Sequence, residues 1–529
     1  MIIIRKKLFF NGTVYTMQQE GATVEAFITE DGLFRFVGSF QDCIQFLKNE
    51  PYEKIDLQGN TVLPGFIDSH LHLIGYGDKL EAIDLSSAQL REDVHQLLKA
   101  ASSKREVILA EGFHEDLLSD GAITKADLDH WFPNQPVVLI RRCYHTILMN
   151  NFALQKWQIQ NWDVPEFEIG KDINGQLNGY IYEGTMEKLR TLIKTYPLPL
   201  LEHYIESAIR DANTYGITSL VTEDLAYYGD WELTLQAFQN VLNHTSHPSM
   251  KLHLLVHHSV WQQVDEKGYF EKQLHPHLSF DSIKFFLDGS LGSRTAYLKT
   301  PYSDDSNNYG ICTFTKEQLE QEVQKARSQK RTVAFHMIGD AAFEMAVSVL
   351  KQFPPALKEQ KDRLIHLSML SEDGIEKLNG LPVVLDLQPI FYSSDHDWMK
   401  DRIGSDRLNH AYLLRSFVQE GFICGGSSDA PIETINPWKS IFAAIQREPI
   451  DETHTTAQTE ALTLYEAISL YTKGSAQTIA SKCGEIRAGY AADFQLYAVN
   501  PFHVSLNEIP KLKPAHLFVS GEPLILSKK

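Results

Sequence analysis

Eight short runs of mostly apolar, often β-branched residues recur along the middle of the chain, and each ends in polar or glycine-rich residues. The runs are GFIDSH (65–70), GITSLVTE (216–223), KLHLLVHH (251–258), SIKFFLDG (282–289), TVAFH (332–336), RLIHL (363–367), PVVLDLQ (382–388) and GFICGGSSD (421–429). Strands that are buried on both faces of a parallel sheet have such continuous apolar sequences. Stretches with helical spacing, such as 315–330 and 340–353, lie between most of them. This alternation predicts an α/β protein with a (β/α)8 TIM barrel over residues 64–483.

The first and second runs are separated by about 140 residues, which is too long for one crossover connection. Two strand-like pieces, EVILAEGF (106–113) and QPVVLIRRC (135–143), occur inside this gap. The sequence therefore predicts a folded subdomain over about residues 75–215, inserted after the first barrel strand.

Both ends of the chain contain short alternating runs with turn glycines. Residues 8–17 and 33–40 precede the barrel, and residues 492–499 and 516–526 follow it. We therefore expect a small β-sandwich domain built from both termini, residues 1–63 and 484–529.

Composition narrows the function classes. The 529 residues exceed one ordinary core, and 43% hydrophobic with 22% charged residues is typical of a soluble globular protein. The net charge of −19 disfavours binding to a phosphate backbone, so we expect no nucleic-acid partner. The apolar start MIIIRKKLFF is broken by Arg5, Lys6 and Lys7, and we expect neither a secretory signal nor a membrane association.

Cysteine usage indicates the compartment. The five cysteines are far apart, odd in number and form no C-x-x-C pair. Free thiols of this kind are typical of the reducing cytoplasm, and the spacing argues against a cysteine-rich zinc site.

The candidate chemistry lies at the ends of the predicted strands. His70 and His72, one residue apart on an extended strand, point to the same face. Further polar side chains end or follow other strands: Lys284, His336, His366 and Asp429. Each has a purely structural alternative, such as a satisfied histidine, a turn aspartate or a lysine reaching solvent. Because active sites of TIM barrels lie at the carboxyl ends of the strands, the whole set favours a site.

Several of these segments together resemble the amidohydrolase superfamily of metal-dependent hydrolases. The segments are GFIDSHLHL, IKFFLDGSLGSRTA, FHMIGDAA, LIHLSML, LQP and GGSSDAPIETINPW. With RRCYHTILMNNFAL in the insertion, they are most similar to the branch that contains N-substituted formamide deformylases. Two departures concern substrate contacts: an additional serine in GGSSDAP, and His114 where an aromatic residue is more usual.

The resemblance implies a set of metal ligands. It assigns His70, His72, His336, His366 and Asp429 to a centre of one or two divalent ions, and Lys284 to the strand-four lysine that can be carboxylated to bridge two metals. Imidazole and carboxylate ligands without thiolate favour Zn²⁺, with iron, manganese or nickel as alternatives.

The predicted function is metal-dependent hydrolysis of a non-peptide carbon–nitrogen bond, in an amide, N-acyl or N-formyl group of a small molecule. A bound metal lowers the pKa of water to about 7, and Asp429 would transfer the proton to the leaving nitrogen. Arg294 is a candidate for binding a substrate carboxylate, with a structural salt bridge as the equal alternative. Glu111, His114 and His145 are weaker candidates for the pocket wall.

Two other functions remain open at this point. A metal-dependent isomerase or decarboxylase can use the same barrel, because the fold does not determine the chemistry. A metal-free scaffold homologue is the second, although the complete ligand set argues against it. The sequence leaves the substrate, the metal and the oligomeric state undecided, and a homodimer is one assembly that it allows.

Overall fold

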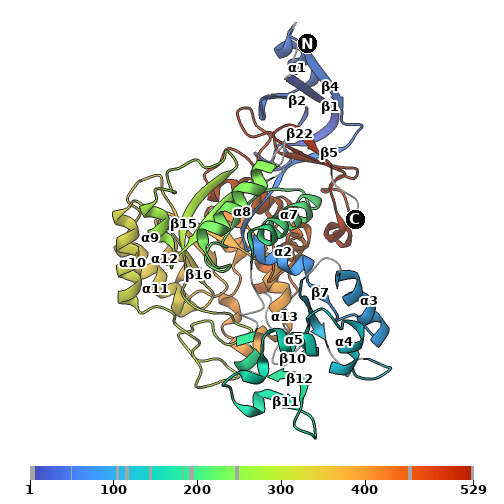
Figure 1. Cartoon of the computed structure of the whole chain (residues 1–529). Helices are drawn as coiled ribbons and strands as arrows, with labels where there is room; N and C mark the ends of the chain where they lie inside the picture. Colours follow the sequence, from blue (N-terminus) through green and yellow to red (C-terminus); the bar gives the residue numbers. More distant parts are fainter. Residues whose placement is uncertain are drawn as a thin grey trace. The chain divides into compact units, whose positions relative to one another are not determined.

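A computed structural model describes residues 6–48, 50–102, 106–113, 118–141, 146–182, 184–186, 188–189, 196–244, 250–448, 450 and 456–525. The chain divides into two units: Met1–Gly77 with Leu198–Lys529, and Asp78–Pro197. In the first unit the chain begins and ends in one sheet and builds the barrel between (Figure 1).

The predicted barrel is present, and every one of the eight runs contributes a strand. The strands are β6 (Phe66–Leu71), β13 (Ile217–Thr222), β14 (Lys251–His257), β15 (Leu278–Phe286), β16 (Val333–Met337), β17 (Asp362–His366), β18 (Val383–Leu387) and β19 (Cys424–Gly426). They pair in parallel in this order. Beyond the last strand, Asp429 N donates to His70 O at 2.9 Å and His72 N donates to Ala430 O at 2.7 Å, which joins the two ends of the sheet.

The last strand is shorter than the run that predicted it. Gly421 has a φ of +79° and Asp429 a φ of +55°, so extended backbone is confined to the middle of the segment. Gly425 and Gly426 leave space for neighbouring side chains, because an added Cβ would lie 2.8 Å from Ser69 Oγ and 2.6 Å from the Tyr471 ring. The packing of this strand therefore depends on its glycines.

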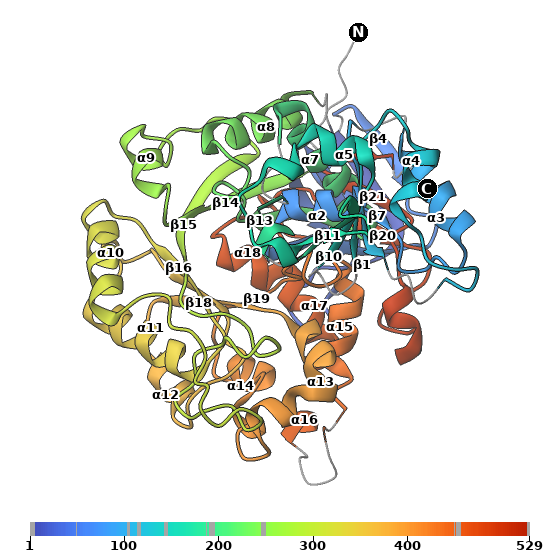
Figure 2. The same ribbon diagram turned by 60° about the horizontal axis from the view of Figure 1, so that its bottom comes forward.

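Helices surround the strands on the outside (Figure 2). In this unit they are α7 (Leu198–Thr214), α8 (Trp231–His244), α9 (Trp261–Glu266), α10 (Lys316–Ser328), α11 (Asp340–Gln352), α12 (Gly374–Leu378), α13 (Pro389–Ile403), α14 (Leu414–Gln419), α15 (Pro437–Ile445), α16 (Thr456–Thr459), α17 (Leu464–Ser469) and α18 (Ser475–Thr478), while α2 (Leu73–Glu81) runs into the second unit. The helix α1 (Phe40–Leu47) packs instead against Leu8, Ala26 and Ile28. Both helical stretches predicted from spacing are confirmed as α10 and α11. A capping box starts α10, because Thr315 and Gln318 exchange side-chain to main-chain hydrogen bonds.

The two termini meet in one eight-stranded sheet. Its strands are β1 (Lys6–Tyr15), β2 (Thr23–Glu30), β3 (Leu33–Gly38), β4 (Tyr52–Asp56), β5 (Thr61–Pro64), β20 (Phe494–Tyr497), β21 (His516–Val519) and β22 (Glu522–Leu524). The antiparallel pair of β5 and β20 joins the two halves. Phe9, Phe27 and Phe494 pack edge-to-face or stacked across that junction, with ring centroids 4.8–5.0 Å apart. Aromatic packing therefore holds the chain ends together.

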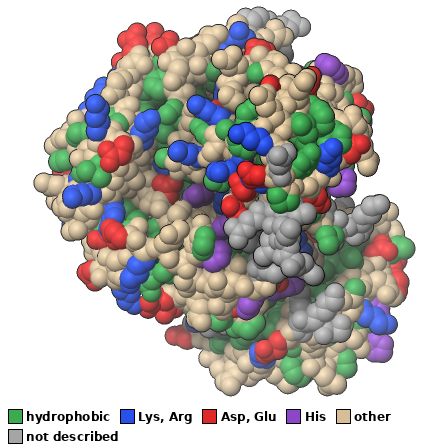
Figure 3. Space-filling model, turned by 90° about the horizontal axis from the view of Figure 1, so that it is seen from above, with side chains coloured by type: hydrophobic (Ala, Val, Ile, Leu, Met, Phe, Trp, Pro, Cys, Tyr) green, Lys and Arg blue, Asp and Glu red, His purple; other side chains and the backbone are tan. Residues whose placement is uncertain are grey.

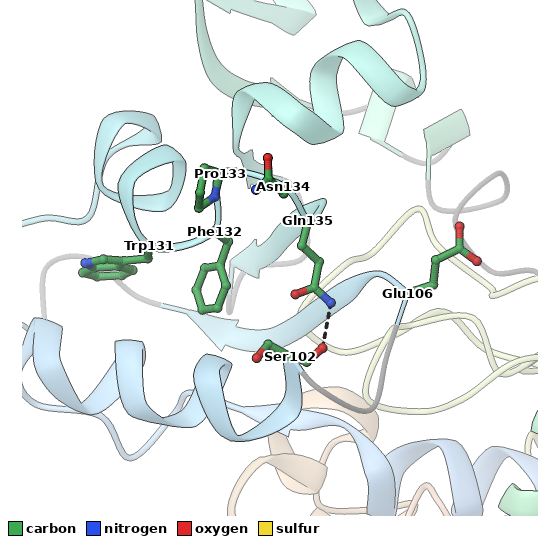
Figure 4. Close-up of a pocket in the computed structure, with 7 residues that line it drawn as sticks. All are labelled: Ser102, Glu106, Trp131, Phe132, Pro133, Asn134 and Gln135. Carbon is green, nitrogen blue, oxygen red and sulfur yellow. Dashed lines mark hydrogen bonds between the residues drawn. The ribbon is translucent and has the colours of Figure 1, made fainter.

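The second unit has its own six-stranded sheet. It contains β7 (Ile83–Asp84), β8 (Ile108–Phe113), β9 (Val137–Arg141), β10 (Thr146–Met149), β11 (Ile169–Lys171) and β12 (Leu177–Tyr182), with α3 (Arg91–Ser102), α4 (Lys125–Trp131) and α5 (Asn151–Lys156). Two separate clusters of buried apolar residues pack within this unit. A shallow hollow of about 520 Å³ lies between Ser102, Glu106 and the segment 131–135, where Gln135 donates to Ser102 O (Figure 4). Its lining holds no cluster of reactive groups.

The surface carries mixed charge. Acidic and basic side chains are interspersed on the face shown in Figure 3, with apolar side chains between them. Among the described helices, none combines the length and the apolar character that crossing a bilayer requires.

Candidate metal centre

The barrel brings all six of the predicted metal-site residues to one end. His70, His336 and His366 lie in the last two residues of their strands, Lys284 lies two residues before the end of β15, and Asp429 follows β19. The register keeps the strand ends level, because Phe286 pairs with His336 and Met337 pairs with His366. Parallel pairing thus brings together side chains that are far apart in the sequence, such as His70 and Asp429, which are 359 positions apart.

One group consists of His70, His72 and Asp429. The Oδ1 atom of Asp429 lies 3.5 Å from His70 Nε2 and 3.6 Å from His72 Nε2. One ligand atom from each of the three residues lies within 4.8 Å of the others. The left-handed backbone of Asp429 and its hydrogen bond to His70 O aim this carboxylate back toward the first strand.

A second group consists of His336 and His366, whose ring centroids are 4.4 Å apart. The His366 ring also lies 5.9 Å from the His70 ring, so the two groups adjoin. Between them, Lys284 Nζ lies 3.0 Å from His70 Nε2. The lysine is fully buried and therefore does not reach solvent.

Hydrogen bonds select the nitrogen that each imidazole presents. His72 Nδ1 donates to Glu223 O at 2.7 Å, and His366 Nδ1 donates to Gln388 Oε1 at 2.8 Å. His336 instead uses Nε2, which donates to Gly289 O at 3.1 Å. In neutral imidazoles the opposite nitrogen then carries a lone pair, namely Nε2 of His72 and His366 and Nδ1 of His336.

The environment keeps these imidazoles neutral. Burial and the nearby Lys284 charge lower the pKa of His72 to about 4 and that of His336 to about 3. Burial lowers the pKa of His70 and of His366 well below its usual value, with further contributions from neighbouring cationic groups. Neutral imidazole is the form that binds a metal.

The donor set fits a divalent cation. Asp429 Oδ1 and His70 Nδ1 are buried without a hydrogen-bond partner in the described chain. The Oδ1 atom faces two imidazole nitrogens, and such acceptors repel one another unless a proton or a cation lies between them. Burial also lowers the pKa of Lys284 to about 8, which makes the amine form that reacts with carbon dioxide accessible. Nitrogen and oxygen ligands of this kind suit a divalent metal ion.

Sequence reasoning missed two residues beside His72. Glu223 is fully buried, and its Oε2 lies 3.7 Å from His72 Nδ1 and accepts a hydrogen bond from the Tyr227 hydroxyl. The Tyr227 ring lies 6.0 Å from the His72 ring and is 43% exposed. The signal for Glu223 was present, because it ends the second apolar run as the predicted ligands end theirs.

The buried ion pair of Arg363 and Asp386 lies beside the first barrel strand. Arg363 forms a two-point contact with Asp386, at 3.0 and 2.8 Å, and donates to Ser69 O at 3.0 Å. Its guanidinium also donates to Asp281 and to Thr478 O. Because Ser69 precedes His70, this network fixes the backbone that carries the ligand pair.

The weaker substrate-binding candidates have different outcomes. Arg294 forms a two-point salt bridge with Asp304, at 3.0 and 2.9 Å, which is the structural alternative considered from the sequence. Glu111 lies on β8 of the second unit. His114 and His145 lie outside the described residues.

Comparison with known proteins gives a consistent family. The profile of the amidohydrolase family matches residues 53–525. YtcJ of Bacillus subtilis (strain 168) is 36% identical, over 98% of this chain and 99% of its own length. The N-substituted formamide deformylase of Arthrobacter pascens is 21% identical, over 98% of both chains. An uncharacterized metal-dependent hydrolase from Pyrococcus furiosus superposes with a TM-score of 0.81 at 28% identity, over 94% of this chain and all of the other.

Proposed function

This chain belongs to the amidohydrolase family of metal-dependent hydrolases, and we propose that it hydrolyses a non-peptide carbon–nitrogen bond in an amide, N-acyl or N-formyl group of a small molecule. The observation that carries the proposal is the meeting of the His70–His72 pair with the His336–His366 pair around Lys284 and Asp429. Similarity to a formamide deformylase along almost the whole chain supports this bond type.

The residues have distinct roles in holding the metal. His70, His72 and Asp429 would hold one divalent ion and His336 with His366 a second, and a carboxylated Lys284 would supply two further oxygen ligands. When bound, a divalent ion such as Zn²⁺ supplies Lewis acidity that polarises a carbonyl group and makes water acidic enough to react near neutral pH. The main-chain oxygens of Glu223 and Gly289 and the Gln388 amide hold the imidazoles in their ligating tautomers.

Asp429 moves the proton. Among the six residues it is the one carboxylate, and its Oδ1 lies beside the imidazoles of His70 and His72. This oxygen takes a proton from the attacking water and delivers it to the departing nitrogen, so that the amine leaves as a neutral group. The buried guanidinium of Arg363, through its hydrogen bonds to Ser69 O and Asp386, keeps the neighbouring backbone in place during this transfer.

A screen of matched N-acyl and N-formyl amines with the zinc-reconstituted chain tests the proposal. The expected product is a free primary or secondary amine, which an amine-reactive fluorophore detects. Asp429→Asn serves as the inactive control. Isomerised or decarboxylated products without amine release would instead support the rival reactions, and a chain that binds no metal would support the scaffold role.

A further inference from the structure

Arg447, two residues after α15, is a buried arginine that has no hydrogen-bond partner among the described residues. Arg447 is 4% exposed, and its guanidinium donates no hydrogen bond to any described residue. Its Nε and Nη1 atoms are also shielded from water. Arg363, the other buried arginine discussed above, donates to two carboxylates and two main-chain oxygens. Arg363 therefore has acceptors for its N–H groups, whereas Arg447 has none among the described residues.

The groups around Arg447 are committed to other partners. The face of the Tyr392 ring lies 3.8 Å from the guanidinium carbon, while its hydroxyl donates to Glu448 O. The Tyr412 hydroxyl donates to Asp395. The carboxylate that acts on Arg447, that of Glu460, accepts hydrogen bonds from the amide and hydroxyl of Ser416. The ring supplies attraction but no acceptor for the N–H groups.

A buried cation is costly when its N–H groups have no hydrogen-bond acceptor. Burial lowers the pKa of Arg447 to about 10, so the guanidinium still carries its charge at neutral pH. Removing a charge from water without hydrogen bonds opposes folding, and natural cores rarely keep such a group. A planar fork of donors without acceptors is the arrangement that a carboxylate completes with two parallel hydrogen bonds.

Arg447 lies at the end of the barrel that holds the candidate metal centre. Tyr392 lies in the first turn of α13, which follows β18 directly, and the preceding residue Phe391 stacks on the ligand His366 with ring centroids 5.7 Å apart. Tyr412 N donates to Ser368 O, two residues past His366. The guanidinium is therefore separated from the metal site by the first turn of α13.

We propose that Arg447 binds the carboxylate of the substrate, so that this chain acts on N-acyl compounds that carry a carboxylate group. The inference rests on the proposed hydrolase function and deepens it by naming a substrate class. The sequence offered Arg294 for this role, but its Nε and Nη2 donate to Asp304. The proposal gives the role to Arg447, whose Nε and Nη1 have no partner among the described residues.

Calorimetric titration of the metal-loaded full chain with phenylacetate, compared with the neutral phenylacetamide, tests the site without catalysis. We expect Arg447→Met to weaken phenylacetate binding about ten- to a hundredfold, because hydrogen bonds to charged groups are lost, and Arg447→Lys to weaken it less. Arg415→Met removes an arginine that donates to Ala461 O and is the matched control with unchanged binding. Equal phenylacetate affinity in wild type and Arg447→Met overturns the proposal.

Thermal unfolding separates a binding role from a structural one. Replacing an unpaired buried charge by methionine should keep or raise the Tm of the ligand-free chain. A large fall in Tm in both Arg447→Met and Arg447→Lys would make the arginine structural and overturn the proposal.

In hydrolysis, the preference for a carboxylate-bearing substrate over its neutral analogue should fall ten- to a hundredfold in Arg447→Met. If no amide is hydrolysed by wild type, the proposed function fails, while phenylacetate binding still decides the role of Arg447.

Discussion

The side-chain nitrogen of Lys284 lies 3.0 Å from Nε2 of His70, so a buried amine contacts the nitrogen that His70 would offer to a metal. The same lysine contributes to the lowered pKa of the other three histidines. A cation at this position opposes metal binding, whereas a carbamate there supplies two anionic oxygens. The contact therefore makes modification of Lys284 the central question for the site.

We predict that Lys284 is carboxylated in the metal-loaded protein. Its pKa of about 8 leaves a fraction of neutral amine at physiological pH, and burial prevents the ammonium from reaching solvent. A crystal grown with metal and bicarbonate should show density for three further atoms beyond Nζ. Density that stops at the amine nitrogen would reject the bridge and leave the histidine and aspartate ligands in place.

The purified chain should hold at least about one divalent metal ion tightly, because its ligands are preorganised on rigid strand ends. Elemental analysis after purification without added metal measures this content. His70→Ala should lower it, whereas His396→Ala, which removes an imidazole next to Asp397 on α13, should leave it unchanged. A metal-free wild-type protein that does not respond to added zinc would contradict the prediction.

Asp429→Asn should lower kcat about a hundred- to ten-thousandfold on any amide that proves to be a substrate, because the asparagine cannot accept and return a proton. Metal content should fall much less, since the histidines remain and the amide oxygen can still face the ion. Asp340→Asn, four residues after His336, is the matched control, because its Oδ1 accepts a hydrogen bond from Lys299 N and the asparagine keeps that acceptor. Near-normal turnover in Asp429→Asn would assign the proton transfer to another group.

Gln388→Met should weaken metal binding about ten- to a hundredfold, because His366 loses the acceptor that fixes its ring and tautomer. The Gln388 amide is oriented by its own donation to Ser427 Oγ at 2.7 Å. Competition with a chelator gives the affinity. Gln388→Glu retains an acceptor and should bind metal more tightly than Gln388→Met; the reverse order would show that the orientation of His366 does not depend on this contact.

Arg363→Met should lower the free energy of unfolding by about 3–5 kcal/mol, because Asp386 is left buried and unpaired. Burial already raises the pKa of Asp386 to about 6, so the folded state binds this proton more tightly than the unfolded chain does. The contribution of Asp386 to the free energy of unfolding therefore falls as pH rises from about 4 to 6. Without Arg363 the pKa rises further, and urea unfolding should show a larger loss at pH 8 than at pH 5. An equal loss at both values would exclude the charge of Asp386 as the cause.

The sequence alone was sufficient to predict the barrel and its six candidate metal-site residues. Apolar runs with polar ends are local patterns, and burial on both faces of a parallel strand requires them. All eight runs became strands, and the side chains at or near their carboxyl ends met because parallel pairing aligns those ends. His70 and His72 share a face for the same local reason, the period of two along an extended chain.

Tertiary structure alone decided which groups are paired and which are left without partners. Arg294 and Arg447 are equally charged in the sequence, yet the fold gives one a carboxylate at 2.9 Å and leaves the other buried without an acceptor among the described residues. Glu223 and Gln388 likewise became partners of histidines 151 and 22 positions away. Hydrogen bonds act over about 3 Å and depend on direction. Such contacts therefore follow from the packing of distant segments, which no local pattern of apolar and polar residues specifies.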